Sequence, residues 1–274
     1  ALPKYTRGEG SHFVPPPASM EWGRVVLSWN GSVKGVQFDR YGALWVDGVE
    51  LLRTTTPEPD STGIHWNITR DVTEYSMLFR KKNGGQNDKN NLTAALAIPT
   101  LVTPTYTGVL YISAKLEFFA AEHNGDHSDH HPPQPDSNRA SVVEEFPQII
   151  PLKNPIVNSS SATGNTPWSV MTAIPDGQAM SSLFSLPTTV KDAVRGYIDL
   201  YASAHACEEF WYSNPPANST GGVCGAGSHR QLQIRINGQV AGIASPFPVI
   251  YTGGVNPLLW RPLTGIMSFD IPPY

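Results

Sequence analysis

The sequence has few charged residues, and it lacks any long apolar run. Asp, Glu, Lys and Arg make up 15% of its 274 residues, against about 25% in a typical soluble domain, which argues against coiled coils and long helical repeats. No segment approaches the roughly 20 apolar residues that a membrane-spanning helix needs. The net charge of −4 gives no electrostatic basis for binding nucleic acid. These absences favour a turn-rich, all-β protein.

Several well-known catalytic and metal-binding motifs are also missing. The chain has no Gly-x-Ser-x-Gly nucleophile elbow, no phosphate-binding loop and no Cys-x-x-Cys pair. A hydrolase built on this sequence must therefore use carboxylates. A polar segment carries four histidines at spacings that match no standard zinc site: His123, His127, His130 and His131. We therefore expect no metal and no cofactor.

Short runs of strand character are present along the chain. With 25 Pro, 24 Gly and 40% hydrophobic residues, the sequence has many turns and enough apolar side chains for a core. Each run is bounded by Gly, Pro, Asn or Asp, as in a β-sandwich or jelly roll. The runs are Arg24–Trp29, Val33–Phe38, Ala43–Val46, Gly63–Ile68, Leu92–Ile98, Val109–Phe119, Arg195–Ala202, Gln231–Ile236 and Pro246–Tyr251. The helix candidate, Ala179–Leu186, is short.

The runs fall into two groups, which predicts two adjacent jelly-roll β-sandwich domains. We expect an N-terminal arm at 1–20, a first jelly roll at 21–119, and a His- and Pro-rich linker or long loop at 120–170. Residues 171–274 would form the first part of a second jelly roll. A domain that stopped there would leave an open sheet edge, so we expect residues or a chain beyond Tyr274 to complete it.

The glycosylation motifs indicate the secretory pathway. Five sites fit Asn-x-Ser/Thr, namely Asn30, Asn67, Asn91, Asn158 and Asn218. Chance matches in a chain rich in Ser, Thr and Asn are the alternative. Cys207 and Cys224 would close a short loop, and in an oxidising compartment we expect a disulfide worth about 2–4 kcal/mol. These features predict a secreted or vacuolar-type glycoprotein.

An acid beside an apolar run is the first candidate for chemistry. Asp39 and Arg40 lie in the segment Gln37–Tyr41. Asp39 either caps a turn or is a carboxylate held in a cleft, where its pKa can be tuned for general base catalysis. Local sequence leaves both possibilities open.

Two acids followed by three aromatic residues form the second candidate. Glu208 and Glu209 precede Phe210, Trp211 and Tyr212. Sugar sites combine aromatic rings, which contact CH faces, with acids that bind hydroxyl groups. The alternative is an aromatic core segment beside the disulfide.

A Gly- and Pro-rich segment, Ser245–Pro262, is the third candidate. Its many Pro residues fix an ordered loop, and Trp260 with Arg261 could clamp a polar substrate. A well-packed connection between strands is the alternative.

Several of these segments resemble the peptide-N-glycanase A family, the plant and fungal amidases that remove N-glycans from glycopeptides. The resemblance covers most of 20–119 and 195–271, and its longest match is Pro246–Pro262. The other matching segments are Gln37–Tyr41, Gly48–Thr54, Pro59–Ile64, Asp71–Tyr75, Phe210–Pro216 and Val240–Gly242. Arg53, within one of them, is therefore a candidate substrate-binding residue.

The bacterial peptide-N-glycosidase F enzymes are more distantly similar, at Phe38–Tyr41, Asp71–Tyr75 and Cys207–Phe210. They fold as two adjacent jelly rolls with the site in the cleft between them. Their essential aspartate corresponds to Asp39 and one supporting glutamate to Glu209, which favours Glu209 over Glu208. A second supporting glutamate of those enzymes has no acidic counterpart here.

The resemblance implies an amidohydrolase that cleaves the bond between an asparagine side chain and N-acetylglucosamine in an N-glycopeptide or glycoprotein. Asp39 would activate water or orient the amide, Glu209 would share the proton load, and Arg40 would neutralise Asp39 or stabilise the oxyanion. Rings at Trp211, Tyr212 and Trp260 would stack on sugars.

The resemblance also implies a heterodimer with a small chain cut from the same precursor. Two other activities remain open at this stage. One is a non-catalytic glycan-binding jelly-roll protein, and the other is an O-glycosidic hydrolase that uses the same carboxylates.

Overall fold

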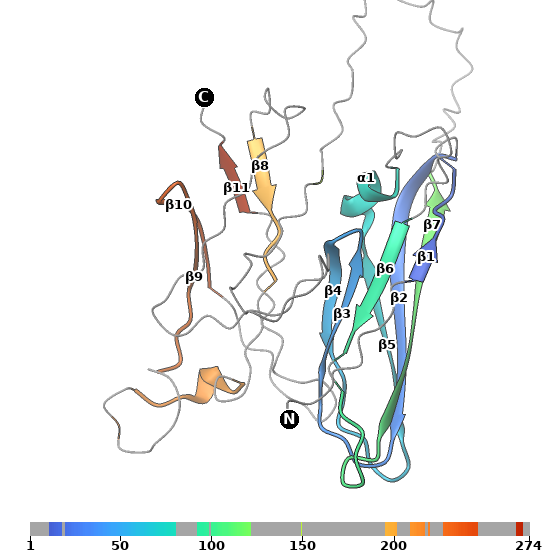
Figure 1. The fold of residues 1–274 in the computed structure, drawn as a ribbon. Coiled ribbons are helices and arrows are strands. Elements are labelled where there is room, and N and C mark those ends of the chain that lie inside the picture. The colour runs from blue at the N-terminus through green and yellow to red at the C-terminus, as the bar shows by residue number, and fades with distance from the viewer. Residues whose placement is uncertain are drawn as a thin grey trace, which may run out of the picture.

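The computed structural model describes residues 11–17, 20–80, 92–98, 100–121, 149, 195–201, 209–216, 219, 227–245 and 267–270. It contains eleven strands within these residues: β1 (Ser11–Phe13), β2 (Trp22–Lys34), β3 (Tyr41–Val46), β4 (Val49–Thr55), β5 (Ile64–Asp71), β6 (Leu92–Ala97), β7 (Val109–Ala120), β8 (Arg195–Ile198), β9 (Leu232–Ile236), β10 (Gln239–Ala244) and β11 (Met267–Asp270). Three short helical turns accompany them: η1 (Thr73–Tyr75), α1 (Ser76–Phe79) and η4 (Trp211–Ser213). The all-β prediction is confirmed (Figure 1).

The described part of the chain contains no helix with the length and apolar character that crossing a membrane requires.

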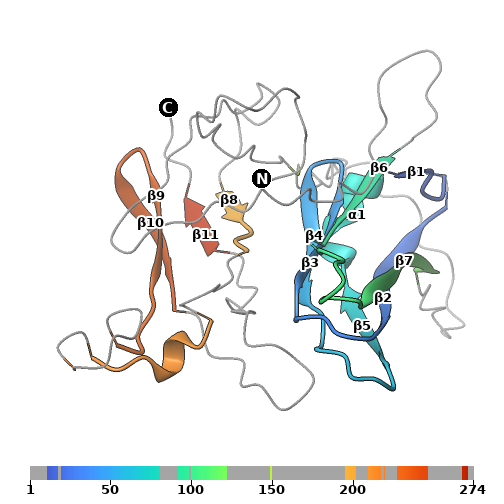
Figure 2. The same cartoon turned by 60° about the horizontal axis from the view of Figure 1, so that its bottom comes forward.

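Two antiparallel sheets form the first half of the molecule. Their strand orders are β1-β6-β3-β4 and β5-β2-β7, and Figure 2 shows the two sheets facing each other. One apolar cluster lies between them, with side chains from both sheets: Trp22, Val25, Leu27, Trp29, Leu44, Val46, Leu51, Leu52, Val72, Tyr75, Leu78, Phe79 and Leu92. Part of the expected N-terminal arm takes part in this sandwich, because Ser11–Phe13 pairs with β6.

The longest strand, β2, holds the second sheet together. It pairs with β5 on one side and β7 on the other, and the inward positions of its central part carry Val25, Leu27 and Trp29. Gly31 also faces a neighbour at close range, because a Cβ atom there would lie 2.2 Å from the Trp66 ring. Glycine at this position therefore allows the indole to lie directly over the strand.

The predicted strand over Val33–Phe38 is wrong beyond Lys34, where β2 ends. Gly35 has a φ of 106°, in the left-handed region that glycine tolerates. The residues from 35 to 40 form a loop that leads into β3. The change of direction after Lys34 removes Asp39 from the sheet and places it at the end of the sandwich.

Strands β3 and β4 form a hairpin that positions the residues on either side of it. The turn lies at Asp47 and Gly48, both with positive φ angles of 46° and 83°, the geometry that a tight two-residue hairpin turn favours. At the other end of the hairpin, Tyr41 pairs with Thr55. The loop before β3 and the segment after β4 therefore lie side by side.

The second half is also built from β-strands. A tight turn at Asn237 and Gly238 joins β9 to β10, and β8 pairs with β11 although more than sixty residues separate them. In Figures 1 and 2 these strands lie beside the β3 and β4 side of the sandwich. Closure of each half as a jelly roll and the proposed domain limits stay predictions. The expected helix at Ala179–Leu186 and the expected strand at Pro246–Tyr251 lie outside the described residues.

Candidate functional site

The loop between β2 and β3 is organised by one buried amide. Gln37 is 5% exposed, and its Nε2 donates hydrogen bonds to the carbonyls of Leu101 and Gly108, each at 3.1 Å. Its Oε1 accepts from the backbone N–H of Phe38 at 3.1 Å and from Nη2 of Arg40 at 2.7 Å. The loop that carries Asp39 is therefore fastened to the segment before β7.

Asp39 is half-buried at the turn of this loop. Burial raises the pKa of its carboxyl group, and the charge of Glu58 raises it further. A hydrogen bond from its own backbone and the charge of Arg40 oppose this increase. These opposing effects are typical of a carboxyl group that exchanges protons during catalysis.

Arg40 is held from three directions. Its Nη2 donates to Gln37, its guanidinium lies 5.6 Å from the centre of the Phe38 ring, and its backbone N–H donates to Oγ1 of Thr56 at 2.8 Å. Its Nε is buried and has no acceptor among the described residues. The cation beside Asp39 is thus fixed in orientation by groups other than Asp39.

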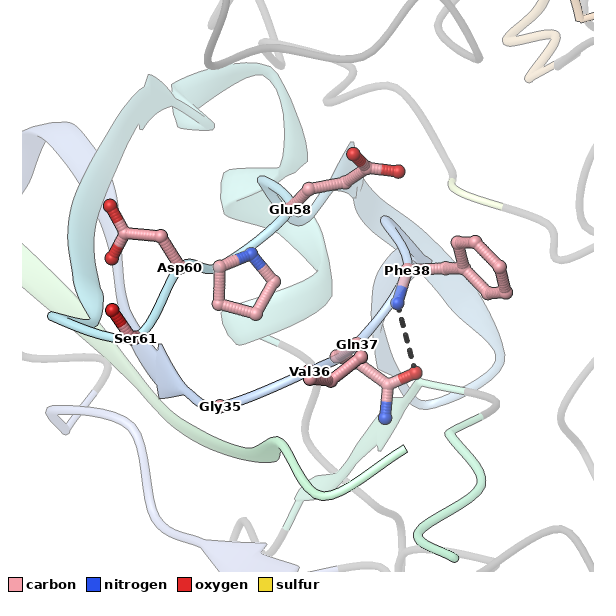
Figure 3. A pocket seen from close by; sticks show the side chains of 8 residues that line it. Gly35, Val36, Gln37, Phe38, Glu58, Asp60 and Ser61 are labelled. Carbon is pink, nitrogen blue, oxygen red and sulfur yellow. Dashed lines mark hydrogen bonds between the residues drawn. The ribbon is translucent and has the colours of Figure 1, made fainter. Parts of the chain in front are cut away.

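A pocket of about 370 Å³ opens beside this loop (Figure 3). Its lining comes from the loop after β2 and from the segment after β4: Gly35, Val36, Gln37, Phe38, Glu58, Pro59, Asp60 and Ser61. Figure 3 shows Glu58 across the pocket from Val36 and Gln37. The pocket thus combines an exposed ring at Phe38, which is 49% exposed, with acidic groups.

Glu209 belongs to the second half of the chain, and the structure brings it close to the acids of the first half. Burial raises the pKa of its carboxyl group, and the charges of Asp39 and Glu58 raise it further. The two acids that sequence analysis selected therefore interact electrostatically across 170 positions of sequence. The Glu209 carboxyl group therefore keeps its proton to a higher pH than a free glutamate would.

Glu58 is a member of this group that sequence reasoning missed. It lies in the exposed segment between β4 and β5, beside one of the matching segments but outside it. The available signal was the Asp-Gly turn at 47–48, since counting back along the hairpin from that turn places Thr55 opposite Arg40. A bulge between Leu44 and Trp45 moves the register by one residue, so that Thr56 pairs with Arg40 instead. An acid two residues beyond Thr56 must then lie near Asp39.

The aromatic segment after Glu209 differs from expectation. Trp211 is 3% exposed, in edge contact with Tyr212, and the guanidinium of Arg230 lies 5.8 Å from its ring centre. A ring buried to this extent offers no face to a sugar, so the stacking role expected for Trp211 does not fit its position. Phe210, which is 47% exposed, presents the accessible ring.

Arg53 forms a buried ion pair rather than facing the pocket. Its Nε and Nη2 donate to the two carboxylate oxygens of Glu50 at 2.7 and 2.9 Å, and its guanidinium lies 5.9 Å from the centre of the Tyr201 ring. Arg70 and Tyr75 in turn contact Tyr201 and Asp199. These residues join the two halves of the chain, so the substrate-binding role expected for Arg53 does not fit.

Two of the five glycosylation motifs lie within the described residues. Asn30 and Asn67 are exposed neighbours on β2 and β5, and Nδ2 of Asn67 donates to Oδ1 of Asn30 at 2.8 Å. The other predicted residues lie outside the described ranges: Asn91, Asn158, Asn218, Cys207, Cys224, Glu208, Trp260, Arg261 and the four histidines of the polar segment. In the described ranges, no three His, Cys, Asp or Glu side chains are arranged to hold a metal ion.

Comparison with known proteins gives one family and a curated relative. Residues 4–274 match the family described as "Peptide N-acetyl-beta-D-glucosaminyl asparaginase amidase A". A protein of Prunus dulcis named "Peptide-N4-(N-acetyl-beta-glucosaminyl)asparagine amidase A" is 33% identical over 281 residues, which cover 98% of this chain and 45% of the relative. The chain thus spans less than half the length of that relative. No solved structure gives a significant match.

Proposed function

Because this chain belongs to the peptide N-acetyl-beta-D-glucosaminyl asparaginase amidase A family, we propose that it hydrolyses the amide between an asparagine side chain and N-acetylglucosamine in N-glycopeptides. The observation that carries the proposal is the electrostatic coupling of Asp39 with Glu209. The two acids come from different halves of the chain, and the loop that carries Asp39 lines a pocket that a sugar or peptide could enter.

In the proposed reaction, ionised Asp39 removes a proton from water, whose oxygen attacks the amide carbon. Arg40 stabilises the negative charge that develops on the carbonyl oxygen, because its orientation is already fixed by Gln37 and Phe38. The C–N bond then breaks, and the leaving nitrogen takes a proton from an acid kept protonated by its neighbours. Glu209 is suited to that role, since burial and the charge of Asp39 raise its pKa.

Hydrolysis by this scheme gives two products. The peptide leaves with aspartate in place of the glycosylated asparagine, and the glycan leaves as a glycosylamine that later loses ammonia in water. An amide is a weak electrophile, so charge stabilisation by fixed groups must supply much of the rate enhancement. The reaction requires neither a metal nor a cofactor.

A glycopeptide assay with mass spectrometry tests the proposal. Wild-type protein should convert the glycosylated asparagine to aspartate, with one oxygen atom from isotopically labelled water in the new carboxyl group. Asp39→Asn should abolish conversion, whereas Asp71→Asn, a change in an exposed acid beside Arg24 and Val26 at the other end of β2 from the Asp39 loop, should retain it. A peptide that kept one sugar would indicate an O-glycosidic hydrolase. Binding without any conversion would indicate a glycan-binding protein.

Three further features belong to this proposal. The glycosylation motifs support passage through the secretory pathway, where Cys207 and Cys224 would form a disulfide. The resemblance supports a second chain from the same precursor as the partner. Mass spectrometry of the protein from its native source, without reduction, tests all three through attached glycans, a cysteine-linked peptide pair and a co-purifying chain.

A further inference from the structure

The side chain of Gln37 uses its full hydrogen-bonding capacity. A primary amide offers two N–H donors and two acceptor lone pairs. Both donors bind carbonyls before β7, and both lone pairs accept from residues that flank Asp39, namely Phe38 and Arg40. No other side chain of this size supplies two donors and two acceptors without a charge.

The packing around Gln37 fixes its position closely. A Cβ atom on Gly108 would lie 2.9 Å from the Cβ of Gln37, so the segment before β7 approaches as near as a glycine allows. The backbone of the preceding residue is also paired, because Gly108 N–H donates to the Val36 carbonyl at 2.8 Å and Val36 N–H donates to Oγ1 of Thr107 at 3.1 Å. Gln37 is thus a rigid support.

We propose that Gln37 is a positioning residue for amide hydrolysis, which holds the Arg40 guanidinium and the backbone N–H of Phe38 so that the charge of Arg40 acts on Asp39. The inference rests on the proposed function. Although Gln37 lines the pocket, its side chain is buried and all its polar groups are engaged within the protein, so none is free to bind substrate.

The position of Arg40 also affects proton exchange at Asp39. The groups that act on this carboxyl are Glu58 and Arg40, and Glu209 is coupled to it from the second half. Arg40 lowers the pKa of Asp39, against burial and Glu58. If the guanidinium moves away, the pKa of Asp39 rises, and ionised Asp39 becomes available only at higher pH.

Two substitutions of Gln37 distinguish a role in positioning Arg40 from a role in stabilising the fold alone. Gln37→Glu keeps the acceptor for Arg40 and Phe38 but loses both donors to the carbonyls, whereas Gln37→Met loses every bond. Gln233→Met is the matched control, because Gln233 is exposed on β9 and its amide bonds only Gln231 and Arg235 among the described residues.

The experiment measures kcat, KM and the pH profile of glycopeptide hydrolysis, with a thermal melt for each variant. We expect Gln37→Met to lower kcat about 100-fold with little change in KM, since a misplaced catalytic group has an effect of this order. The acidic limb of the pH–rate profile of Gln37→Met should move to higher pH. Gln37→Glu should retain more activity than Gln37→Met even where its melting temperature is no higher. Activity losses that simply follow melting temperature would overturn the inference.

Two further measurements keep the test decisive. If Gln37→Met does not fold, carboxyl NMR titration of Asp39 in Gln37→Glu, in Arg40→Met and in the double variant replaces it. Action through Arg40 predicts shifts in the pKa of Asp39 that do not add, whereas the direct effect of the added carboxylate is the same with or without Arg40, so purely additive shifts would refute the inference. If the wild type hydrolyses no glycopeptide, the proposed function fails. The Asp39 titration, followed by carboxyl NMR in wild type and the Gln37 variants, then still decides whether Gln37 sets the ionisation of Asp39.

Discussion

Asp39 and Glu209 come from the two halves of the chain, and the charge of Asp39 raises the pKa of Glu209. Burial has the larger effect on both groups. Because the charge of Asp39 makes Glu209 harder to ionise, the two acids can divide the roles of base and acid between them. The relationship also explains why catalysis would require both halves, since neither half contains the pair.

The third carboxyl group, Glu58, sets the pH range of the site. Its charge raises the pKa of both Asp39 and Glu209, so Glu58→Gln should lower both pKa values. The base then ionises at lower pH, the acid loses its proton at lower pH, and the whole pH–rate profile for glycopeptide hydrolysis shifts to lower pH. Asp60→Asn is the control, because Asp60 lines the same pocket without affecting Asp39 or Glu209. An unchanged profile for Glu58→Gln would contradict this prediction.

Adjacent aromatic residues after Glu209 should have separate effects. Phe210→Ala removes an exposed ring and should raise KM by about 2- to 10-fold, the value of one aromatic contact, with no change in melting temperature. Trp211→Ala empties a buried position and should cost about 3–5 kcal/mol of unfolding free energy. Kinetics and thermal melts of the two variants measure the change in KM and the change in stability separately. Equal effects on both quantities would show that the assignment of the two rings is mistaken.

The buried ion pair of Glu50 and Arg53 should make stability depend on pH. Their side chains are 5% and 11% exposed, so Arg53→Met leaves a buried charge and should cost about 3–5 kcal/mol at neutral pH. Burial already raises the pKa of Glu50, and Arg53 opposes that increase. Without Arg53 the pKa rises further, so the loss is smallest at low pH, where Glu50 is protonated, and grows as pH rises through that pKa.

Denaturation with urea at several pH values measures this effect. The matched control is Lys115→Met, which breaks the exposed pair of Lys115 and Glu117 and should change stability by less than about 1 kcal/mol. A loss in Arg53→Met that did not vary with pH would argue against a buried, unpaired Glu50 charge.

The close approach of Trp66 to Gly31 gives a stability prediction. A Cβ atom at Gly31 would lie 2.2 Å from the indole, so Gly31→Ala must displace the ring and should cost about 1–3 kcal/mol. Ser28→Ala, in the same strand, should change stability by less than about 0.5 kcal/mol. Thermal melts with tryptophan fluorescence report both the loss and the movement of the ring. A melting temperature equal to that of the wild type would count against the packing seen here.

Local residue patterns were enough to predict the class of fold and most of the candidate chemistry. Alternation along Val109–Phe119 and the many turn residues predicted strands, because a strand with one buried face requires that period. Asp39, Arg40 and Glu209 were found through local residue types and resemblance. Their coupling could not be derived from sequence, because it depends on how the second half lies against the first.

Tertiary structure decided which neighbours of those residues have a role. Gln37 and Phe210 were ordinary members of their segments in the sequence, and Glu58 lay outside them. The burial of Trp211 and the pairing of Arg53 with Glu50 could not be foreseen either, since exposure and partners depend on distant parts of the chain. Local periodicity specifies which residues can form strands, whereas the hydrogen bonds and charges around Asp39 arise only when β2, β4 and the segment before β7 meet.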